Sequence, residues 1–184
     1  MVLGNDYTTR TYTAHSCELF AEDAYQAADT FRRGVVLGDF LDLIENAKKP
    51  LLYVGGGVIS ASAHKNLAIL AKRYQLPVTT TLMGKGAFDE RDPLSVGMLG
   101  MHGTAYANFA VTECDLLVAI GARFDDRVTG KLDTFAPRAK VIHFEIDPAE
   151  VSKNRVAEVA VLGDVRESLT NLLELSKQKN VRPN

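Results

Sequence analysis

Cysteine is scarce in this sequence, and an excess of basic charge and long apolar runs are missing from it. Only two cysteines occur, Cys17 and Cys114, with no CxxC pair, which argues against a disulfide scaffold and a cysteine-based metal site. The 21 basic and 23 acidic residues give a formal net charge of -2, without the basic excess that binds nucleic acid or a membrane surface. No run approaches the roughly 20 apolar residues that cross a bilayer, and the start, MVLGNDYTTR, lacks a signal-peptide pattern. We therefore expect a cytoplasmic protein with neither nucleic acid nor membrane as a partner.

Motifs of reactive sites are missing as well. The sequence has no GxSxG elbow, no HExxH and no P-loop lysine, and its spacing identifies no pair of catalytic carboxylates. We assign no catalytic residue and no metal ligand, and expect a site that holds a cofactor without reacting.

Five short apolar runs follow Pro50, each leading to a glycine or acidic turn. Most are continuously apolar or β-branched, as in parallel strands that helices cover on both faces. With 184 residues and 46% hydrophobic content, the chain suits one domain. We predict a three-layer α/β sandwich with a Rossmann-like parallel sheet of about six strands. The runs are LLYV (51–54), VTTTL (78–82), LLVAI (116–120), VIHFEI (141–146) and VAVL (159–162).

Helices are predicted between the runs. One follows Ser60, where apolar residues from Ala63 to Tyr74 form one stripe, and residues 39–49 form another that stops at Pro50. Asp147 and Asp164 each read as the N-cap of a further helix.

The domain boundaries follow from these elements. We expect a central domain over residues 39–176 and a frayed tail over 177–184. The segment 1–38 has an unclear status, with one possible helix over residues 22–33.

Three glycine-rich loops follow predicted strands. Gly55, Gly56 and Gly57 let the backbone approach a ligand closely, although a plain strand-to-helix turn explains GGG equally well. The other two loops are TLMGKGAF and MLGMHGTAYANFA, the second containing Gly100, Met101, His102 and Gly103. Loops at the carboxyl ends of parallel strands share one edge of the sheet, where such folds bind ligands. We read His102 as a ligand contact rather than a catalytic base.

The segment GARFDDRVTG places charged side chains at the same edge. Arg123 and Arg127 can meet phosphates or a carboxylate, while Asp125 and Asp126 can orient the guanidiniums or accept from ribose hydroxyls. An internal Arg/Asp ion-pair network is the structural alternative.

Two acidic residues lie near the ends of the last two predicted runs. Glu145 is the candidate acceptor for ribose hydroxyls. Asp164 has a second explanation as a helix cap, and we interpret His143, inside a run, as a buried core residue.

These segments together resemble one family. LLYVGGGVIS, TTTLMGKGAF, LGMHGTAYAN, GARFDDRVTGKL, AKVIHFEIDPAEVSKN and VLGDV are similar to the central domain of the acetohydroxyacid synthase (acetolactate synthase) large catalytic subunit, from about Asp39 to Leu175. The resemblance implies a parent enzyme that condenses two 2-ketoacids with loss of carbon dioxide in branched-chain amino-acid biosynthesis. That parent uses thiamine diphosphate, magnesium and FAD, and its central domain binds the FAD, which has no net redox role.

The resemblance also implies the flavin contacts, named here by their numbers in this sequence. They are Gly55, Gly56, Gly57, Thr81, Leu82, Met83, Gly100, Met101, His102, Gly103, Gly121, Arg123, Asp125, Arg127, Val128, Glu145, Ile146, Asp164 and Val165.

The thiamine-activating glutamate and the GDG…N motif of the family's flanking domains are missing here, so we expect the chain to be inactive alone. The resemblance implies three partners: flanking thiamine-binding domains, a second copy of the parent, and a regulatory small subunit. It also allows a plastid location if the source is a plant or alga. The alternatives are an NAD-dependent enzyme on the same type of sheet, which the missing GxGxxG disfavours, and a non-catalytic interaction module.

Overall fold

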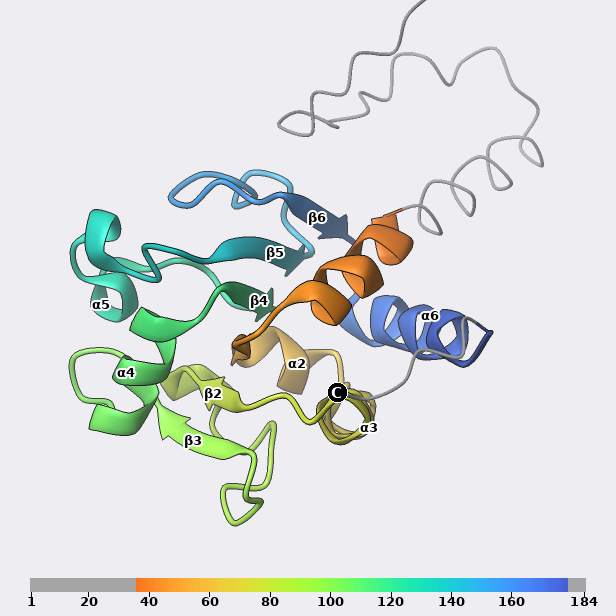
Figure 1. The fold of residues 1–184 in the computed structure, drawn as a ribbon, viewed down its shortest axis with the longest axis horizontal. Helices are drawn as coiled ribbons and strands as arrows, with labels where there is room; N and C mark the ends of the chain where they lie inside the picture. Colours follow the sequence, from red (N-terminus) through yellow and green to blue (C-terminus); the bar gives the residue numbers. More distant parts are fainter. Residues whose placement is uncertain (1–35, 179–184) are drawn as a thin grey trace, which may run out of the picture.

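The computed structural model describes residues 36–178, which form one parallel sheet with helices on both faces. The sheet order is β3-β2-β1-β4-β5-β6, and every neighbouring pair is parallel. Figure 1 shows α3, α6 and the helix over residues 36–46 on one side, with α4 and α5 on the other. The predicted three-layer α/β sandwich is therefore confirmed. The strands are β1 (Pro50–Val54), β2 (Val78–Thr80), β3 (Ser95–Met98), β4 (Leu116–Ile120), β5 (Lys140–Glu145) and β6 (Val159–Leu162).

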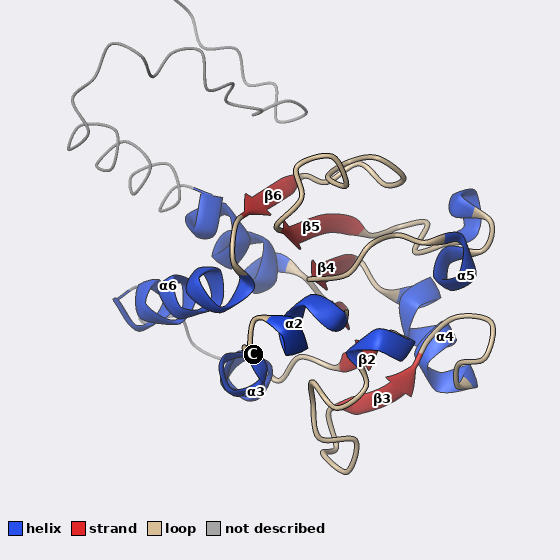
Figure 2. Ribbon diagram, turned by 180° about the vertical axis from the view of Figure 1, so that it is seen from behind, coloured by secondary structure: helices blue, strands red, loops and turns tan. Residues whose placement is uncertain are grey.

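Within residues 36–178, α-helices connect three of the five pairs of successive strands, while β2 and β3, and β5 and β6, are joined by loops without an α-helix (Figure 2). The two short 3-10 turns belong to the loops at one edge of the sheet. The elements are α2 (Gly56–Ser60), α3 (His64–Tyr74), η2 (Leu82–Gly84), α4 (Ala105–Glu113), α5 (Asp126–Thr129), η3 (Leu132–Thr134) and α6 (Val165–Gln178).

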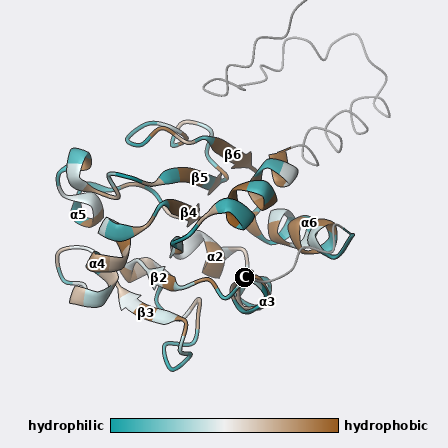
Figure 3. Cartoon of the chain, in the orientation of Figure 1, coloured by the Kyte–Doolittle hydropathy of each residue, from teal (hydrophilic) through white to brown (hydrophobic). Residues whose placement is uncertain are grey.

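Two hydrophobic cores lie on the two faces of the sheet. The larger contains Phe40, Leu67 and Leu169 from the helices over 36–46, α3 and α6. The smaller contains Tyr53 and Phe124 with the buried side of α4. Figure 3 shows that α6 carries both hydrophobic and hydrophilic residues, and its buried apolar residues belong to the larger core. Because the central strands are buried on both faces, their runs are apolar without alternation.

The predicted apolar stripe of α3 is confirmed. Leu67, Leu70, Ala71 and Tyr74 are buried, and Ala63 immediately before the helix is buried too. The cap at Asp164 is also confirmed, since its Oδ1 accepts from two backbone N–H groups at the start of α6.

The helix predicted to start at Asp147 is wrong. Residues 146–158 form turns between β5 and β6, although Asp147 does accept from the N–H of Ala149. This loop has no apolar stripe to bury, and tertiary bonds from Asn154 and Arg155 to distant carbonyls hold it instead.

Three boundaries also differ from prediction. The first described helix ends at residue 46 rather than 49, because the N–H groups of Lys48 and Lys49 donate to the carboxylate of Asp115. β2 ends at Thr80, and Ile146 lies beyond β5. β3 was not among the predicted runs, because SVGM is short and only half-buried.

Several sequence expectations lie outside the described residues. They are the possible helix over 22–33, the segment up to residue 35, Cys17 and the tail from residue 179. Lys177 belongs to α6.

Candidate functional site

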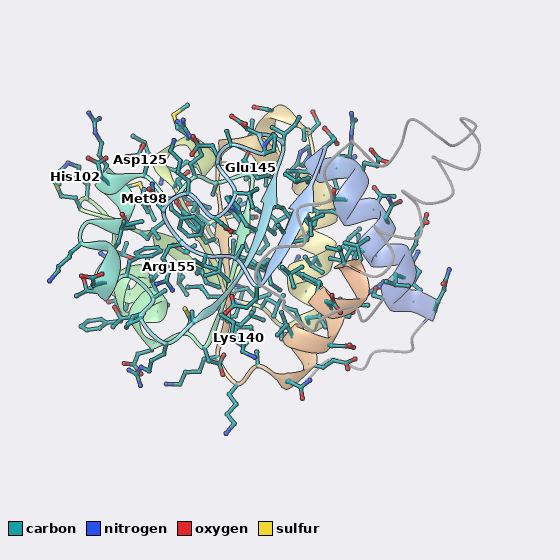
Figure 4. The ribbon with its side chains drawn as sticks, turned by 90° about the horizontal axis from the view of Figure 1, so that it is seen from above. Met98, His102, Asp125, Lys140, Glu145 and Arg155 are labelled. Carbon is teal, nitrogen blue, oxygen red and sulfur yellow. The ribbon has the colours of Figure 1, made fainter. Side chains whose placement is uncertain are left out.

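The predicted site residues lie in the six loops that follow the carboxyl ends of the strands. This sheet order reverses between β1 and β4, the switch point where open α/β sheets form their ligand crevice. Figure 4 shows His102, Asp125 and Glu145 toward one end of the molecule and Lys140, the first residue of β5, toward the other. The loops therefore share the edge that the sequence predicted.

The loops after β1 and β4 contact each other directly at the switch point. The N–H of Gly57 donates to the carbonyl of Gly121 at 3.0 Å, and the N–H of Gly55 donates to the carbonyl of Ile120 at the end of β4. A Cβ on Gly55 would lie 2.2 Å from the oxygen of Gly121, so no other residue fits there. Glycine at these positions thus serves loop packing, and two of the three N–H groups are already used within the fold.

The loop after β3 lies against the loop after β4. A Cβ on Gly100, which has a φ of +93°, would lie 3.1 Å from the carbonyl oxygen of Arg127 and 3.4 Å from the Cα of Val128. The side chain of Asn108 on α4 bonds both backbone groups of Gly100. His102 and Met101, at the tip of this loop, are exposed.

The charged residues of GARFDDRVTG do not form the internal ion-pair network. Neither Arg123 nor Arg127 has an ion pair with a carboxylate in the described part of the chain. Asp125 instead caps α5, and its carboxylate accepts from the N–H of Arg127. The exposed guanidiniums are therefore available to an anionic ligand.

Electrostatics keep Asp125 ionised. A side-chain hydrogen bond with Asp126 and the backbone N–H of Arg127 lower the pKa of Asp125, and the positive charges of Arg123 and Arg127 act in the same direction. A carboxylate beside two guanidiniums can accept hydrogen bonds from hydroxyl groups while the guanidiniums bind phosphate.

Glu145 is less exposed to solvent than its predicted role as a ligand contact required. It is buried, and its Oε1 accepts from the N–H groups of Ile146 and Asp147. Its Oε2 lies 3.7 Å from Nε2 of His143. The carboxylate thus shapes the end of β5, while Ile146 beside it is exposed.

The remaining predicted residues also have structural roles. Thr81 caps η2 by accepting from Gly84, while Leu82 and Met83 are exposed. A Cβ on Gly56 would lie 3.2 Å from Cβ of Met83. At the end of β6, Asp164 caps α6 and the side chain of Val165 is buried in the core.

Apolar side chains are unusually exposed along this edge. Met101, Met83, Leu82 and Ile146 each expose between 69% and 80% of their surface, although large apolar residues normally lie inside. Single exposed residues need no explanation, but three in the neighbouring loops after β2 and β3, with a fourth after β5 at the same edge, indicate a surface that a ligand or another domain covers.

Three residues that the sequence analysis did not single out support these loops. Tyr53, Asn108 and Asn154 each donate from a side chain to a loop carbonyl. Asn108 lies inside the quoted segment MLGMHGTAYANFA, so its polar side chain near the start of a helix was a usable signal. Tyr53 sits in an apolar strand, and nothing local marks its hydroxyl.

The other chemical candidates are inert. Burial raises the pKa of the Cys114 thiol to about 12, and its Sγ donates to the carbonyl of Val111. Within residues 36–178, no group of three His, Cys, Asp or Glu side chains is placed to hold a metal ion. Nor is any helix in that range long and apolar enough to span a membrane.

The chain matches known proteins along this whole domain. Residues 37–172 match the family model described as thiamine pyrophosphate enzyme, central domain. The acetolactate synthase large subunit of Parasynechococcus marenigrum (strain WH8102) is 77% identical over 143 residues, which cover 78% of this chain and 23% of that protein. That of Porphyra purpurea is 62% identical over 141 residues, or 77% of this chain and 24% of that protein.

A more distant relative has the same span. The probable acetolactate synthase large subunit of Methanocaldococcus jannaschii is 54% identical over 131 residues, 71% of this chain and 22% of that protein. The chain thus spans about a quarter of the length of the curated relatives that it matches.

Proposed function

This chain belongs to the thiamine pyrophosphate enzyme family as a central domain, and we propose that it is the FAD-binding domain of an acetolactate synthase large subunit. The relatives named for that subunit are similar across the segment that contains the six ligand-edge loops. The proposal therefore assigns to these loops a cofactor that carries phosphate, ribose and large aromatic rings.

One observation carries the flavin assignment: two guanidiniums at the switch point of the sheet have no carboxylate partner within the part of the chain that the structure describes. Arg123 and Arg127 would hold the diphosphate, because planar guanidiniums bind phosphate oxygens in pairs. Asp125 would accept from a hydroxyl of the sugar or ribityl chain. The residues present thus fit the polar parts of FAD.

The apolar parts of FAD have a matching surface. Leu82, Met83, Met101 and Ile146 are exposed in loops at the same edge, and adaptable methionine side chains pack well on aromatic rings. Met83 also lies beside Gly56, where an added Cβ would lie only 3.2 Å from the Cβ of Met83, so the loops after β1 and β2 pack closely here.

We propose that the parent enzyme condenses two 2-ketoacids with decarboxylation, using thiamine diphosphate and magnesium held by its other domains. This chain supplies flavin binding and is inactive alone, because its sequence lacks the thiamine-activating glutamate and the GDG…N motif of the family's flanking domains. Its partners in the parent are the flanking thiamine-binding domains, a second copy of the subunit and a regulatory small subunit.

A titration of the chain with FAD, followed by flavin fluorescence, tests the proposal, with NAD as the competitor. We expect saturable FAD binding that excess NAD does not displace. A version extended into the flanking sequence of the parent is the second sample. Displacement by NAD, or failure of both samples to bind FAD, would overturn the assignment in favour of a nicotinamide enzyme or a non-catalytic module.

A further inference from the structure

The backbone between β4 and α5 is held by three side chains from elsewhere in the fold. Three consecutive carbonyls, those of residues 122–124, each accept one hydrogen bond from a different element. The donors come from β1, from β5 and from the loop between β5 and β6, and we name them the carbonyl clamp. The bonds are Tyr53 Oη to Arg123 O (2.7 Å), His143 Nε2 to Ala122 O (2.9 Å) and Asn154 Nδ2 to Phe124 O (2.7 Å).

The clamp acts where the flavin-binding side chains begin. Ala122 and Phe124 are buried while Arg123 and Asp125 are exposed, so the segment directs alternate side chains inward and outward. Phe124 packs against the rings of Tyr53 and His143, with ring centroids 5.7 and 5.2 Å away. The inner side chains and the carbonyls are therefore fixed together.

The protonation states of Tyr53 and His143 keep each side chain as a hydrogen-bond donor to its carbonyl. Burial raises the pKa of the Tyr53 hydroxyl, which therefore stays protonated and able to donate. Because Nε2 of His143 donates to Ala122, its neutral form leaves Nδ1 without a proton, and no partner for Nδ1 is found in residues 36–178. The ring is therefore committed to one bond.

A loop without such support would sample many conformations, and binding would have to order it at a cost in affinity. Among residues 36–178 the guanidinium of Arg123 has no ion pair that would fix it, so its backbone is the part that the fold can preorganise.

We infer that Tyr53, His143 and Asn154 are positioning residues of the flavin site, which hold Arg123 and Asp125 in the conformation that binds the cofactor. This inference rests on the proposed function. It adds residues that act on the site through the backbone that they hold.

Matched variants separate positioning from general stability. Tyr53→Phe removes only a hydroxyl, and Tyr74→Phe removes a buried hydroxyl in the other core. Asn154→Ala removes one side-chain bond to a carbonyl, and the control Asn66→Ala removes two side-chain bonds between α3 and α6, to the carbonyl of Arg166 and the hydroxyl of Thr170.

His143 has its own pair of variants. His143→Gln keeps an N–H donor near the position of Nε2, while His143→Leu keeps volume without a donor. If the hydrogen bond is what matters, glutamine restores binding and leucine does not.

Flavin affinity is the first readout. We expect each of Tyr53→Phe, Asn154→Ala and His143→Leu to weaken FAD binding about 5-fold, as one lost hydrogen bond implies. The Tyr53→Phe/Asn154→Ala double variant should lose about 30-fold. Tyr74→Phe and Asn66→Ala should stay within about 2-fold of the original protein.

Amide hydrogen exchange of the flavin-free chain is the second readout. The N–H groups of residues 127–129 bond to Asp125 or Asp126, so their exchange reports the order of this loop. The clamp variants should speed exchange there and leave the sheet protected, whereas the controls should not.

The two readouts separate the two proposals. If neither the original chain nor its extended version binds FAD, the proposed function fails while the exchange data still decide the clamp. Clamp variants that match their controls in exchange at residues 127–129 would overturn the inference. So would variants that speed exchange there yet retain the original flavin affinity.

Discussion

Asn108 on α4 bonds Gly100 twice, accepting from its N–H at 2.9 Å and donating to its carbonyl at 3.1 Å. Both bonds are made by one exposed side chain, and the loop that they fix ends in Met101 and His102. The loop after β3 is thus ordered by a helix that begins only a few residues later.

Replacing Asn108 with alanine should free this loop. Two bonds at the surface contribute about 1 to 2 kcal/mol together, so we expect flavin affinity to fall about 5-fold or more while the sheet stays intact. Thr112→Ala on the same helix is the control, because its hydroxyl bonds only within α4. Equal FAD titration curves for the two variants would contradict this role for Asn108.

The double variant Arg123→Ala/Arg127→Ala should lose FAD retention while keeping its fold. Each charge-assisted bond lost should cost about 1.5 to 3 kcal/mol. Flavin absorbance of the purified protein measures retention, and circular dichroism checks the fold.

A control with the same charge change exists. Arg91→Ala/Arg138→Ala removes two guanidiniums that form surface ion pairs. If this control loses as much FAD as the first double variant, general charge rather than the switch-point site is responsible.

Gly57→Ala and Gly56→Ala should differ in stability although the two residues are neighbours. A Cβ at Gly57 would lie 2.7 Å from Cα of Gly121, whereas at Gly56 the nearest atom would be 3.2 Å away. We expect Gly57→Ala to destabilise by about 2 kcal/mol or more and Gly56→Ala by less than about 1 kcal/mol. Urea unfolding monitored by circular dichroism measures both, and equal midpoints would refute the close approach of the two loops.

His143 should make stability depend on pH below about 6.5. Burial is the main cause that lowers its pKa in the fold, outweighing the bond to Ala122 and the charge of Glu145 that would raise it. Between the lowered pKa and the unfolded value of about 6.5, the unfolded chain binds more protons. The contribution of His143 to the free energy of unfolding is therefore complete above about pH 6.5 and is lost as the pH falls below that value.

The slope that this single group can add is at most about 1.4 kcal/mol per pH unit. His143→Gln cannot titrate, so its unfolding free energy should fall less than that of the original protein between pH 6.5 and 5. Parallel curves over this range would show that His143 is not the group responsible.

Self-association is expected at high concentration. Tyr106 and Phe109 on α4 expose 78% and 70% of their surface, and Met101 lies exposed nearby in sequence. Tyr106→Lys/Phe109→Lys should lower the apparent mass in light scattering, while Ile69→Lys on α3 should not. A clean monomer for the original chain at high concentration would contradict this expectation.

Much of the fold was readable from local patterns. The run at 116–120 matches β4, because a strand buried on both faces is apolar at every position. The run at 159–162 matches β6, an edge strand in which Val159 and Val161 are buried. The missed strand β3 is half-buried and contains Gly97, so neither run length nor periodicity revealed it. The cap at Asp147 was a local signal that tertiary bonds overruled.

The candidate site was also predictable from the sequence only in part. The glycine-rich loops and the charged decapeptide were found because parallel strands bring their carboxyl ends to one edge. Whether the arginines were paired, and whether Glu145 was open, depended on neighbours from other strands.

The sequence by itself determined the α/β class, five of the six strands, the edge on which the loops meet and the family to which the chain belongs. These properties reside in hydrophobic spacing and short motifs that neighbouring residues carry together. Only the tertiary structure decided that Tyr53, His143 and Asn154 hold the backbone of Arg123. Those bonds join residues 70, 21 and 30 positions apart, and no local pattern encodes a partner at that distance.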